Sequence, residues 1–124
     1  MKQKFEIDCT GDVVVGDTIC FTEAVYRGSF RRPEYIGGRT ITARVIGDSY
    51  GEAKNQHTFK LELIGVEGVE PRDVLVKGKK RGYILRRARN VYRNNTARTK
   101  WDNEAGRSAP LQEKHGRGDA ARAA

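Results

Sequence analysis

The sequence has few of the residues that hold small domains together through disulfides or a metal. Among its 124 residues are two cysteines, Cys9 and Cys20, and two histidines. The Cys and His residues are not spaced as zinc ligands are, and two cysteines in a chain without an apolar leader suit free thiols in a reducing compartment. We therefore predict no structural metal, no cofactor and a cytoplasmic location.

Long apolar runs are also missing. No stretch approaches the roughly 18 residues that a membrane-spanning helix needs. The first six residues, Met1–Glu6, include two lysines and a glutamate but no apolar segment, so we expect no secretory signal. The sequence therefore predicts no contact with a membrane.

Large aliphatic and phenylalanine side chains are scarce and unevenly placed. Leu, Ile, Val and Phe number 26, and 25 of them lie in residues 1–92, with Leu111 the exception. Residues 1–93 can therefore bury a modest core, whereas residues 94–124 have too little apolar surface to offset the entropy of ordering the chain. We predict a small β-rich domain with a terminal helix over 1–93 and a polar, flexible C-terminal tail over 94–124.

The residues that are present favour strands. Valine and isoleucine total 17 against five leucines, and β-branched side chains suit extended backbone. Apolar and polar residues alternate over residues 18–22, 40–45 and 58–63, so that Phe59 and Leu61, for example, face the same side. This alternation predicts an antiparallel sheet with one face buried and the other in water.

The connections between these strands complete the predicted fold. Residues 26–38 form a connection too long for a tight hairpin, and we further expect a short strand over 73–76, a hairpin tip over 77–82 and a helix over 85–93. The fold class is then mainly β: a small antiparallel, strongly bent sheet or partly open barrel, with one C-terminal helix and a polar tail. SH3-like, OB-like and PUA-like barrels all have this size, and the sequence does not choose among them.

Acidic residues are absent from one long stretch. Residues 74–101 carry ten lysines and arginines and no acid, whereas residues 1–73 have a net charge of −2 and residues 102–124 a net charge of zero. A concentrated basic block is typical of proteins that bind polyanions, because lysine and arginine displace the counterions of phosphates. Tyr83, Tyr92 and Trp101 are interleaved with the block. The two tyrosines either stack on unpaired bases or belong to the core, whereas Trp101, in the predicted tail, is expected to supply a stacking or anchoring contact.

The block supplies the candidate residues for binding nucleic acid or a protein partner: Lys77, Lys79, Lys80, Arg81, Arg86, Arg87, Arg89, Arg93, Arg98, Lys100 and Trp101.

His57 is the strongest catalytic candidate in the sequence. It lies close to Asp48 and Glu52 along the chain, so a general base for phosphodiester cleavage is conceivable. A turn histidine that hydrogen-bonds its neighbours explains the same pattern, and the sequence offers no second catalytic group. We predict no catalytic residue and a protein that is not an enzyme.

Two groups of short segments carry a resemblance to a known class of proteins. The segments are Ser49-Tyr50-Gly51 with Gln56-His57-Thr58-Phe59, and Ala88-Arg89-Asn90-Val91-Tyr92-Arg93 with Trp101 and Glu113-Lys114-His115. They resemble small accessory proteins of uncertain role encoded by tailed bacteriophages. The resemblance implies a bacterial host cytoplasm and a binding role directed at the host, and it assigns no functional residue.

The leading functional hypothesis is a non-catalytic binding protein. It would present its basic surface either to nucleic acid, DNA or RNA without sequence preference, or to an acidic surface of a host protein. The alternative is a phage-type inhibitor that binds and blocks a host protein or defence complex. The sequence leaves open the oligomeric state and the identity of the partner.

Overall fold

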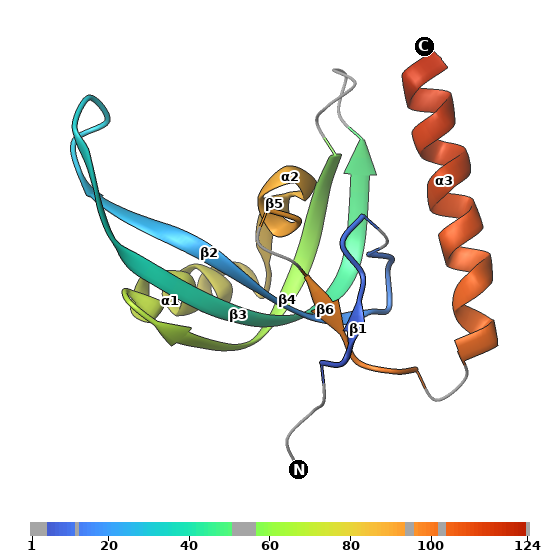
Figure 1. The fold of residues 1–124 in the computed structure, drawn as a ribbon, viewed down its shortest axis with the longest axis horizontal. Helices are drawn as coiled ribbons and strands as arrows, with labels where there is room; N and C mark the ends of the chain where they lie inside the picture. The colour runs from blue at the N-terminus through green and yellow to red at the C-terminus, as the bar shows by residue number, and fades with distance from the viewer. Residues whose placement is uncertain (1–4, 12, 51–56, 94–95, 102–103, 124) are drawn as a thin grey trace.

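The computed structural model describes residues 5–11, 13–50, 57–93, 96–101 and 104–123 (Figure 1). Six strands of this described part form one antiparallel sheet in the order β1-β6-β2-β3-β4-β5. Their bounds are β1 Ile7–Asp8, β2 Thr18–Gly28, β3 Pro33–Tyr50, β4 His57–Gly68, β5 Ile84–Arg87 and β6 Ala97–Arg98. The sheet is bent and does not close on itself, which confirms the predicted fold class.

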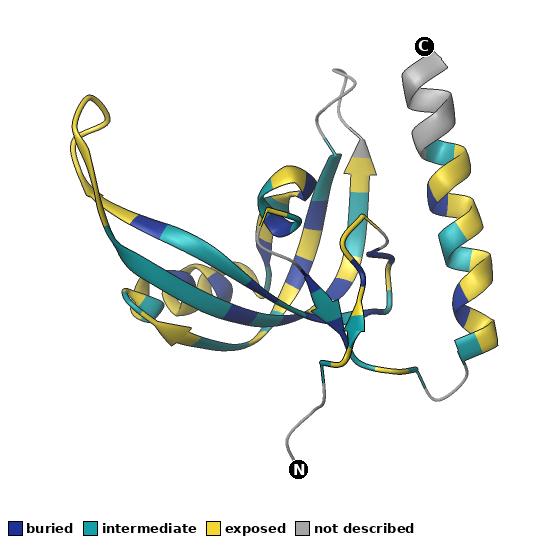
Figure 2. Cartoon of the chain, viewed as in Figure 1, coloured by how far each residue is buried: buried dark blue, intermediate teal, exposed yellow. Residues whose placement is uncertain are grey.

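The three predicted alternations form the centre of this sheet. Ile19 and Phe21 of β2 are buried, as are Ile41 of β3 and Phe59 and Leu61 of β4. These side chains belong to one apolar cluster, and the residues between them on β4 face solvent. Figure 2 shows the resulting stripes of buried and exposed residues along the strands.

The long connection predicted between β2 and β3 is instead a continuous hairpin. Pairing runs without a break in the ladder from Thr18↔Arg44 to Gly28↔Pro33, with one register shift between Val25 and Tyr26. The two strands therefore extend well past the rest of the sheet and project as an arm (Figure 1). The prediction was wrong because backbone pairing, and not burial of an alternating face, continues these strands.

The strand predicted over 73–76 and the hairpin tip predicted over 77–82 are wrong. Residues Pro71–Arg81 form one helix, α1, which packs against β4. Pro71 stands in its first turn, and Gly82 adopts a φ of +77° at its end, where its N–H donates to the Gly78 carbonyl at 2.6 Å. Proline at the start and glycine after the end are the usual boundary residues of a helix.

The helix predicted over 85–93 is only partly correct. Residues Ile84–Arg87 pair with β4 as strand β5, and the helical turn α2 covers Ala88–Val91. Leu85 is exposed, whereas Ala88 and Val91 join the core. The helix was predicted too long because Leu85, which is exposed on β5, was counted in the same apolar face as Ala88 and Tyr92.

The segment beyond residue 93 contributes to the packed body. Strand β6 lies between β1 and β2, and the 3-10 turn η1 (Glu104–Arg107) and helix α3 (Ser108–Ala123) follow it. Arg107 and Lys114 from this segment are buried. The sheet thus crosses the boundary predicted at 93/94. No helix in the described ranges is long and apolar enough to cross a membrane.

Candidate functional site

The structure divides the predicted basic residues among three places. Lys77, Lys79, Lys80 and Arg81 are exposed on α1. Arg86 and Arg87 lie on β5, Arg89 on α2 and Arg93 just after it; Arg86 is half-buried and the other three are exposed. Arg98, Lys100 and Trp101 lie on or beside β6, at a separate place in the sheet.

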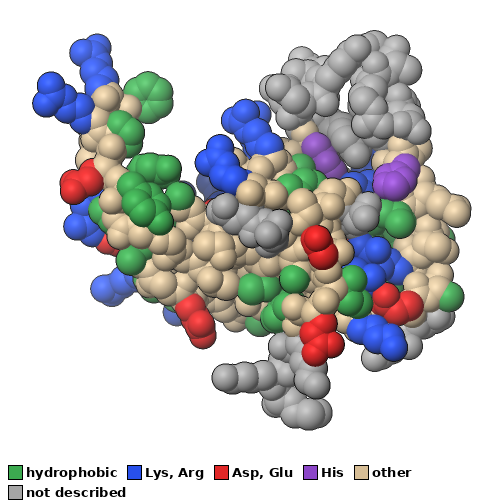
Figure 3. Space-filling view, viewed as in Figure 1, with side chains coloured by type: hydrophobic (Ala, Val, Ile, Leu, Met, Phe, Trp, Pro, Cys, Tyr) green, Lys and Arg blue, Asp and Glu red, His purple; other side chains and the backbone are tan. Residues whose placement is uncertain are grey.

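A groove brings the first two groups together. Its lining comes from β2, β3, α1, β5 and α2, and its volume is about 280 Å³. Lys77, Arg86 and Arg93 of the predicted set line it, together with Arg39 and Tyr26, which the sequence did not single out. In Figure 3, lysine and arginine side chains gather over α2, beside the base of the arm.

Glu23 neutralises part of the charge in this groove. It accepts hydrogen bonds from the Arg39 Nε at 2.7 Å and from the Arg86 Nε at 2.9 Å. Burial alone would raise the pKa of Glu23, but the hydrogen bonds and charges of Arg86 and Arg39 outweigh it and hold the pKa below its ordinary value. Arg39 also donates to Asp73 at 2.5 Å, so it is doubly paired.

Two cations of the groove keep their charge unopposed. Lys77 and Arg93 form no ion pair with any acidic residue of the described part, and the same holds for five exposed neighbours in sequence. These five are Lys79, Lys80, Arg81, Arg87 and Arg89. The surface around the groove therefore has an excess of positive charge that the fold itself does not use.

Arg98 and Trp101 serve the fold. The Arg98 guanidinium is buried and donates to both carboxylate oxygens of Glu104, at 3.0 and 2.8 Å. The Trp101 indole N–H donates to Asp17 at 2.7 Å, and its ring lies so close over Gly16 that a Cβ there would come within 2.9 Å of it. The Arg98 pair ties η1 to β6, and the Trp101 contacts hold the segment after β6 against the residues just before β2.

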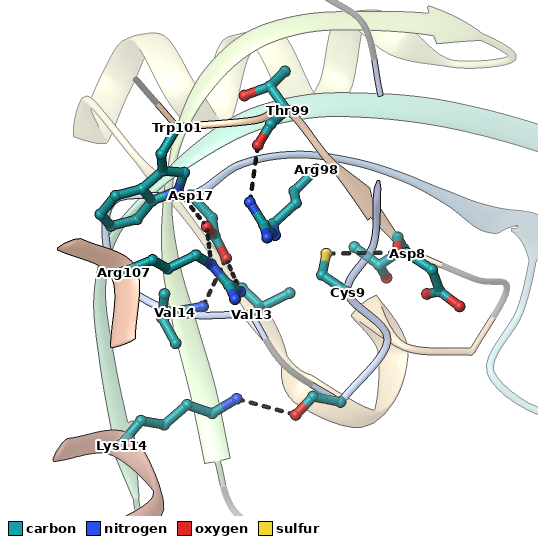
Figure 4. A network of polar contacts seen from close by, with 12 residues as sticks. Asp8, Cys9, Val13, Val14, Asp17, Arg98, Thr99, Trp101, Arg107 and Lys114 are labelled. Carbon is teal, nitrogen blue, oxygen red and sulfur yellow. Dashed lines mark hydrogen bonds and ion pairs between the residues drawn. The ribbon is translucent and has the colours of Figure 1, made fainter. Parts of the chain in front are cut away.

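Asp17 is the centre of this buried network (Figure 4). It has no exposed surface and accepts four hydrogen bonds: from the Trp101 indole, twice from the Arg107 guanidinium at 2.9 and 2.8 Å, and from the Val14 N–H at 3.0 Å. Each carboxylate oxygen thus has two donors. The sequence offered only a turn at Gly16-Asp17, because the residues that complete the network lie more than 80 positions away.

A second, shallower depression lies beside Trp101. Gly16, Thr18, Arg44, Thr99, Lys100, Trp101 and Gly106 line it, with a volume of about 510 Å³. Arg44 and Lys100 are both exposed there. This depression carries two cations at a distinct position from the groove, which makes it a natural comparison for charge substitutions.

The lowered pKa of Glu104 leads us to expect a loss of stability in acid. Its hydrogen bonds from Arg98 and from the Trp101 N–H lower its pKa from 4.5 to about 2. A depressed pKa stabilises the fold above the unfolded value, and this contribution disappears as the pH falls toward the folded value. We expect the urea midpoint to decline between about pH 5 and about pH 2, and the difference between wild type and Glu104→Gln to shrink over that window. A difference independent of pH would contradict this role.

His57 also takes part in a contact between distant elements. Its Nε2 lies 3.2 Å from Asp48 Oδ2, and the other Asp48 oxygen accepts from Arg117 of α3 at 2.8 Å. Burial raises the pKa of Asp48, but its bonds to His57 and Arg117 outweigh this and lower the value overall. The His57 ring also packs on Phe59, with centroids 4.6 Å apart. The cluster joins α3 to β3 and β4, and the absence of catalysis stays a prediction.

Comparison with known proteins places the chain in a family. A family model described as a domain of unknown function, DUF7699, matches residues 9–101. The chain belongs to this family. The DUF7699 chain is also 35% identical over 127 residues to zinc finger CCCH domain-containing protein 62 of Oryza sativa subsp. japonica; the match covers 95% of this chain and 17% of that protein. No solved structure matches the DUF7699 chain.

The plant relative overturns the resemblance to bacteriophage proteins. The segments that suggested it, around His57 and Tyr92, are short, and the rice protein matches nearly the whole chain. The similarity indicates a eukaryotic origin, so the bacterial host and the phage-type inhibitor lose their basis. The chain spans only 17% of the rice protein, and with two cysteines in all it has fewer than a CCCH zinc finger requires.

Proposed function

We propose that this DUF7699 domain is a non-catalytic module that binds nucleic acid through the groove between α1, β2 and α2. The observation that carries the proposal is that Lys77 and Arg93 form no ion pair with an acidic residue of the described ranges. Glu23, in the same groove, is already hydrogen-bonded to Arg39 and Arg86, so it balances the charge of those two arginines and not that of Lys77 and Arg93. The remaining cations would bind phosphates, releasing counterions from the nucleic acid.

The size and surroundings of the groove support this proposal. A volume of about 280 Å³ is at the small end of ligand sites, which suits a phosphate and its sugar better than a large organic ligand. The five exposed cations nearby extend the positive surface beyond the groove. The relative with a zinc finger in its name is compatible with this reading, since zinc fingers commonly bind nucleic acid.

The salt dependence of binding tests the proposal. The Lys77→Gln/Arg93→Gln variant should lower the slope of log affinity against log salt by about 1.4–1.8, because each lost phosphate contact accounts for about 0.7–0.9. The Arg44→Gln/Lys100→Gln variant is the matched control: it removes the same charge from the depression beside Trp101 and should change the slope less. Labelled DNA and RNA strands, titrated between about 50 and about 200 mM salt, provide the measurement.

Two outcomes would contradict the proposal. A wild-type domain that binds neither DNA nor RNA at about 50 mM salt would exclude it and favour an acidic protein surface as the partner. Equal slopes for wild type and the Lys77/Arg93 variant would show that the nucleic acid does not lie in the groove. Fold integrity of both variants is checked by their urea midpoints, which should match that of the wild type.

A further inference from the structure

The arm carries a cluster of aromatic side chains that the core does not use. We define the arm as residues 26–36, the hairpin end of β2 and β3. Phe30 at its tip is fully exposed, and Tyr26 and Tyr35 are 57% and 62% exposed. Val25 is the last buried residue of β2 before the arm begins. Residues 26–35 of the arm are exposed, as Figure 2 shows.

The arm has a defined geometry. Its strands pair up to Gly28↔Pro33, and the Arg32 N–H donates to both the carbonyl and the hydroxyl of Ser29, at 3.2 and 3.1 Å. The rings of Tyr26 and Tyr35 meet edge to face, with centroids 5.7 Å apart. A two-stranded ribbon is marginally stable by itself, and three aromatic rings that remain exposed to water do not contribute burial energy to the fold. Their placement therefore points to an interaction with a partner.

The charge of the arm indicates the chemistry of that partner. Arg27, Arg31 and Arg32 are exposed there against one acid, Glu34. Arg27 pairs with Glu70 at the base of the arm, whereas Arg31 and Arg32 pair with no acidic residue of the described part. Figure 3 shows basic and hydrophobic side chains together at the tip. Arginine beside aromatic rings is the combination that binds phosphates and bases at once.

The arm is continuous with the groove. Tyr26 lines the groove together with Lys77 and Arg93, and the same side chain contacts Tyr35 across the hairpin. A nucleic-acid strand whose phosphates lie in the groove would therefore contact the Tyr26 ring where the groove meets the arm. The remaining rings and arginines follow toward the tip.

We infer that the arm binds single-stranded nucleic acid, with bases stacked on Tyr26, Tyr35 and Phe30 and phosphates held by Arg31 and Arg32. This inference rests on the proposed function and names its substrate. Flat, exposed rings can stack only on bases that are not already stacked in a duplex. Stacking tolerates any base, so the domain needs no sequence preference.

Substitution of Phe30 tests the inference. Phe30→Leu keeps an apolar side chain at the tip but removes the flat ring, and it should weaken binding to a single strand by about 5-fold or more. Phe30→Trp should retain binding, and the fluorescence of the new tryptophan should be quenched when the strand is added. The wild type, which contains only Trp101, gives the fluorescence change that is due to Trp101 alone. Leu75→Ala, at an exposed apolar position on α1, is the matched control and should leave the affinity unchanged.

The salt slope and a duplex probe separate this inference from the proposed function. Phe30→Leu removes no charge, so the salt slope should stay at the wild-type value while the affinity for single strands falls. Binding of the same sequence as a duplex should be unaffected. If Phe30→Leu binds single strands as well as wild type while the Lys77/Arg93 effect persists, the groove proposal stands and the arm inference is wrong. An equal loss for duplex and single strand would also overturn it, and a wild type that binds no strand would exclude both.

Discussion

Replacing Asp17 by asparagine should lower the free energy of unfolding by about 3–5 kcal/mol, because it leaves the Arg107 guanidinium buried without a counter-charge. Asp17 has no exposed surface, and all four of its donors lie within 3.0 Å. Asparagine has the same shape, but its amide group would meet donors where the carboxylate had accepted bonds. The change therefore tests the charge and hydrogen bonds of this network with little change in volume.

The measurement is urea unfolding of wild type, Asp17→Asn, Arg107→Gln and the double variant. Because the two side chains contact each other directly, the double variant should lose less than the sum of the two single losses. Glu62→Gln, at an exposed acid of β4, is the control and should change stability by less than about 0.5 kcal/mol. An Asp17→Asn loss as small as that of the control would mean that the network does not hold the segment after β6.

Replacing Phe59 by alanine should have a similarly large effect, about 3–5 kcal/mol, because it opens a cavity in the centre of the sheet. Phe59 is fully buried, lies against His57 and meets the Tyr92 ring edge to face with centroids 5.9 Å apart. Tyr92 in turn accepts a hydrogen bond from the Val13 N–H at 3.1 Å. Loss of the Phe59 ring therefore loosens the contact between β4 and Tyr92 at the end of α2 and, through Tyr92, the contact to the segment that precedes β2.

Phe30→Ala is the matched control for this experiment. It removes the same atoms from a side chain that is fully exposed, so its effect on stability should stay within about 0.5 kcal/mol. Thermal or urea unfolding of the two variants provides the comparison. Equal losses would contradict either the burial of Phe59 or the exposure of Phe30, and an undisturbed Phe30→Ala variant would also show that arm substitutions can be read as changes in binding.

The sequence by itself determined the inner face of the sheet and the position of the basic block. Alternation over 18–22, 40–45 and 58–63 is a local property, and a period of two places every second side chain on the same face whatever the topology. The boundary residues of α1 were equally local: Pro71, Asp73 and Gly82 mark a helix. The run of Val74, Leu75 and Val76 was nevertheless interpreted as a strand, because a short apolar run does not distinguish the two.

Only the tertiary structure decided which cations remain available and what closes the fold. Arg86 meets Glu23 across 63 residues, Arg107 meets Asp17 across 90, and β6 enters the sheet between β1 and β2. Such pairings depend on how the chain returns to itself, and no local periodicity records them. Ten cations between residues 74 and 101 are visible in the sequence. Only the three-dimensional structure distinguishes Lys77 and Arg93, which pair with no acid of the described part, from Arg98, which is buried and paired with Glu104.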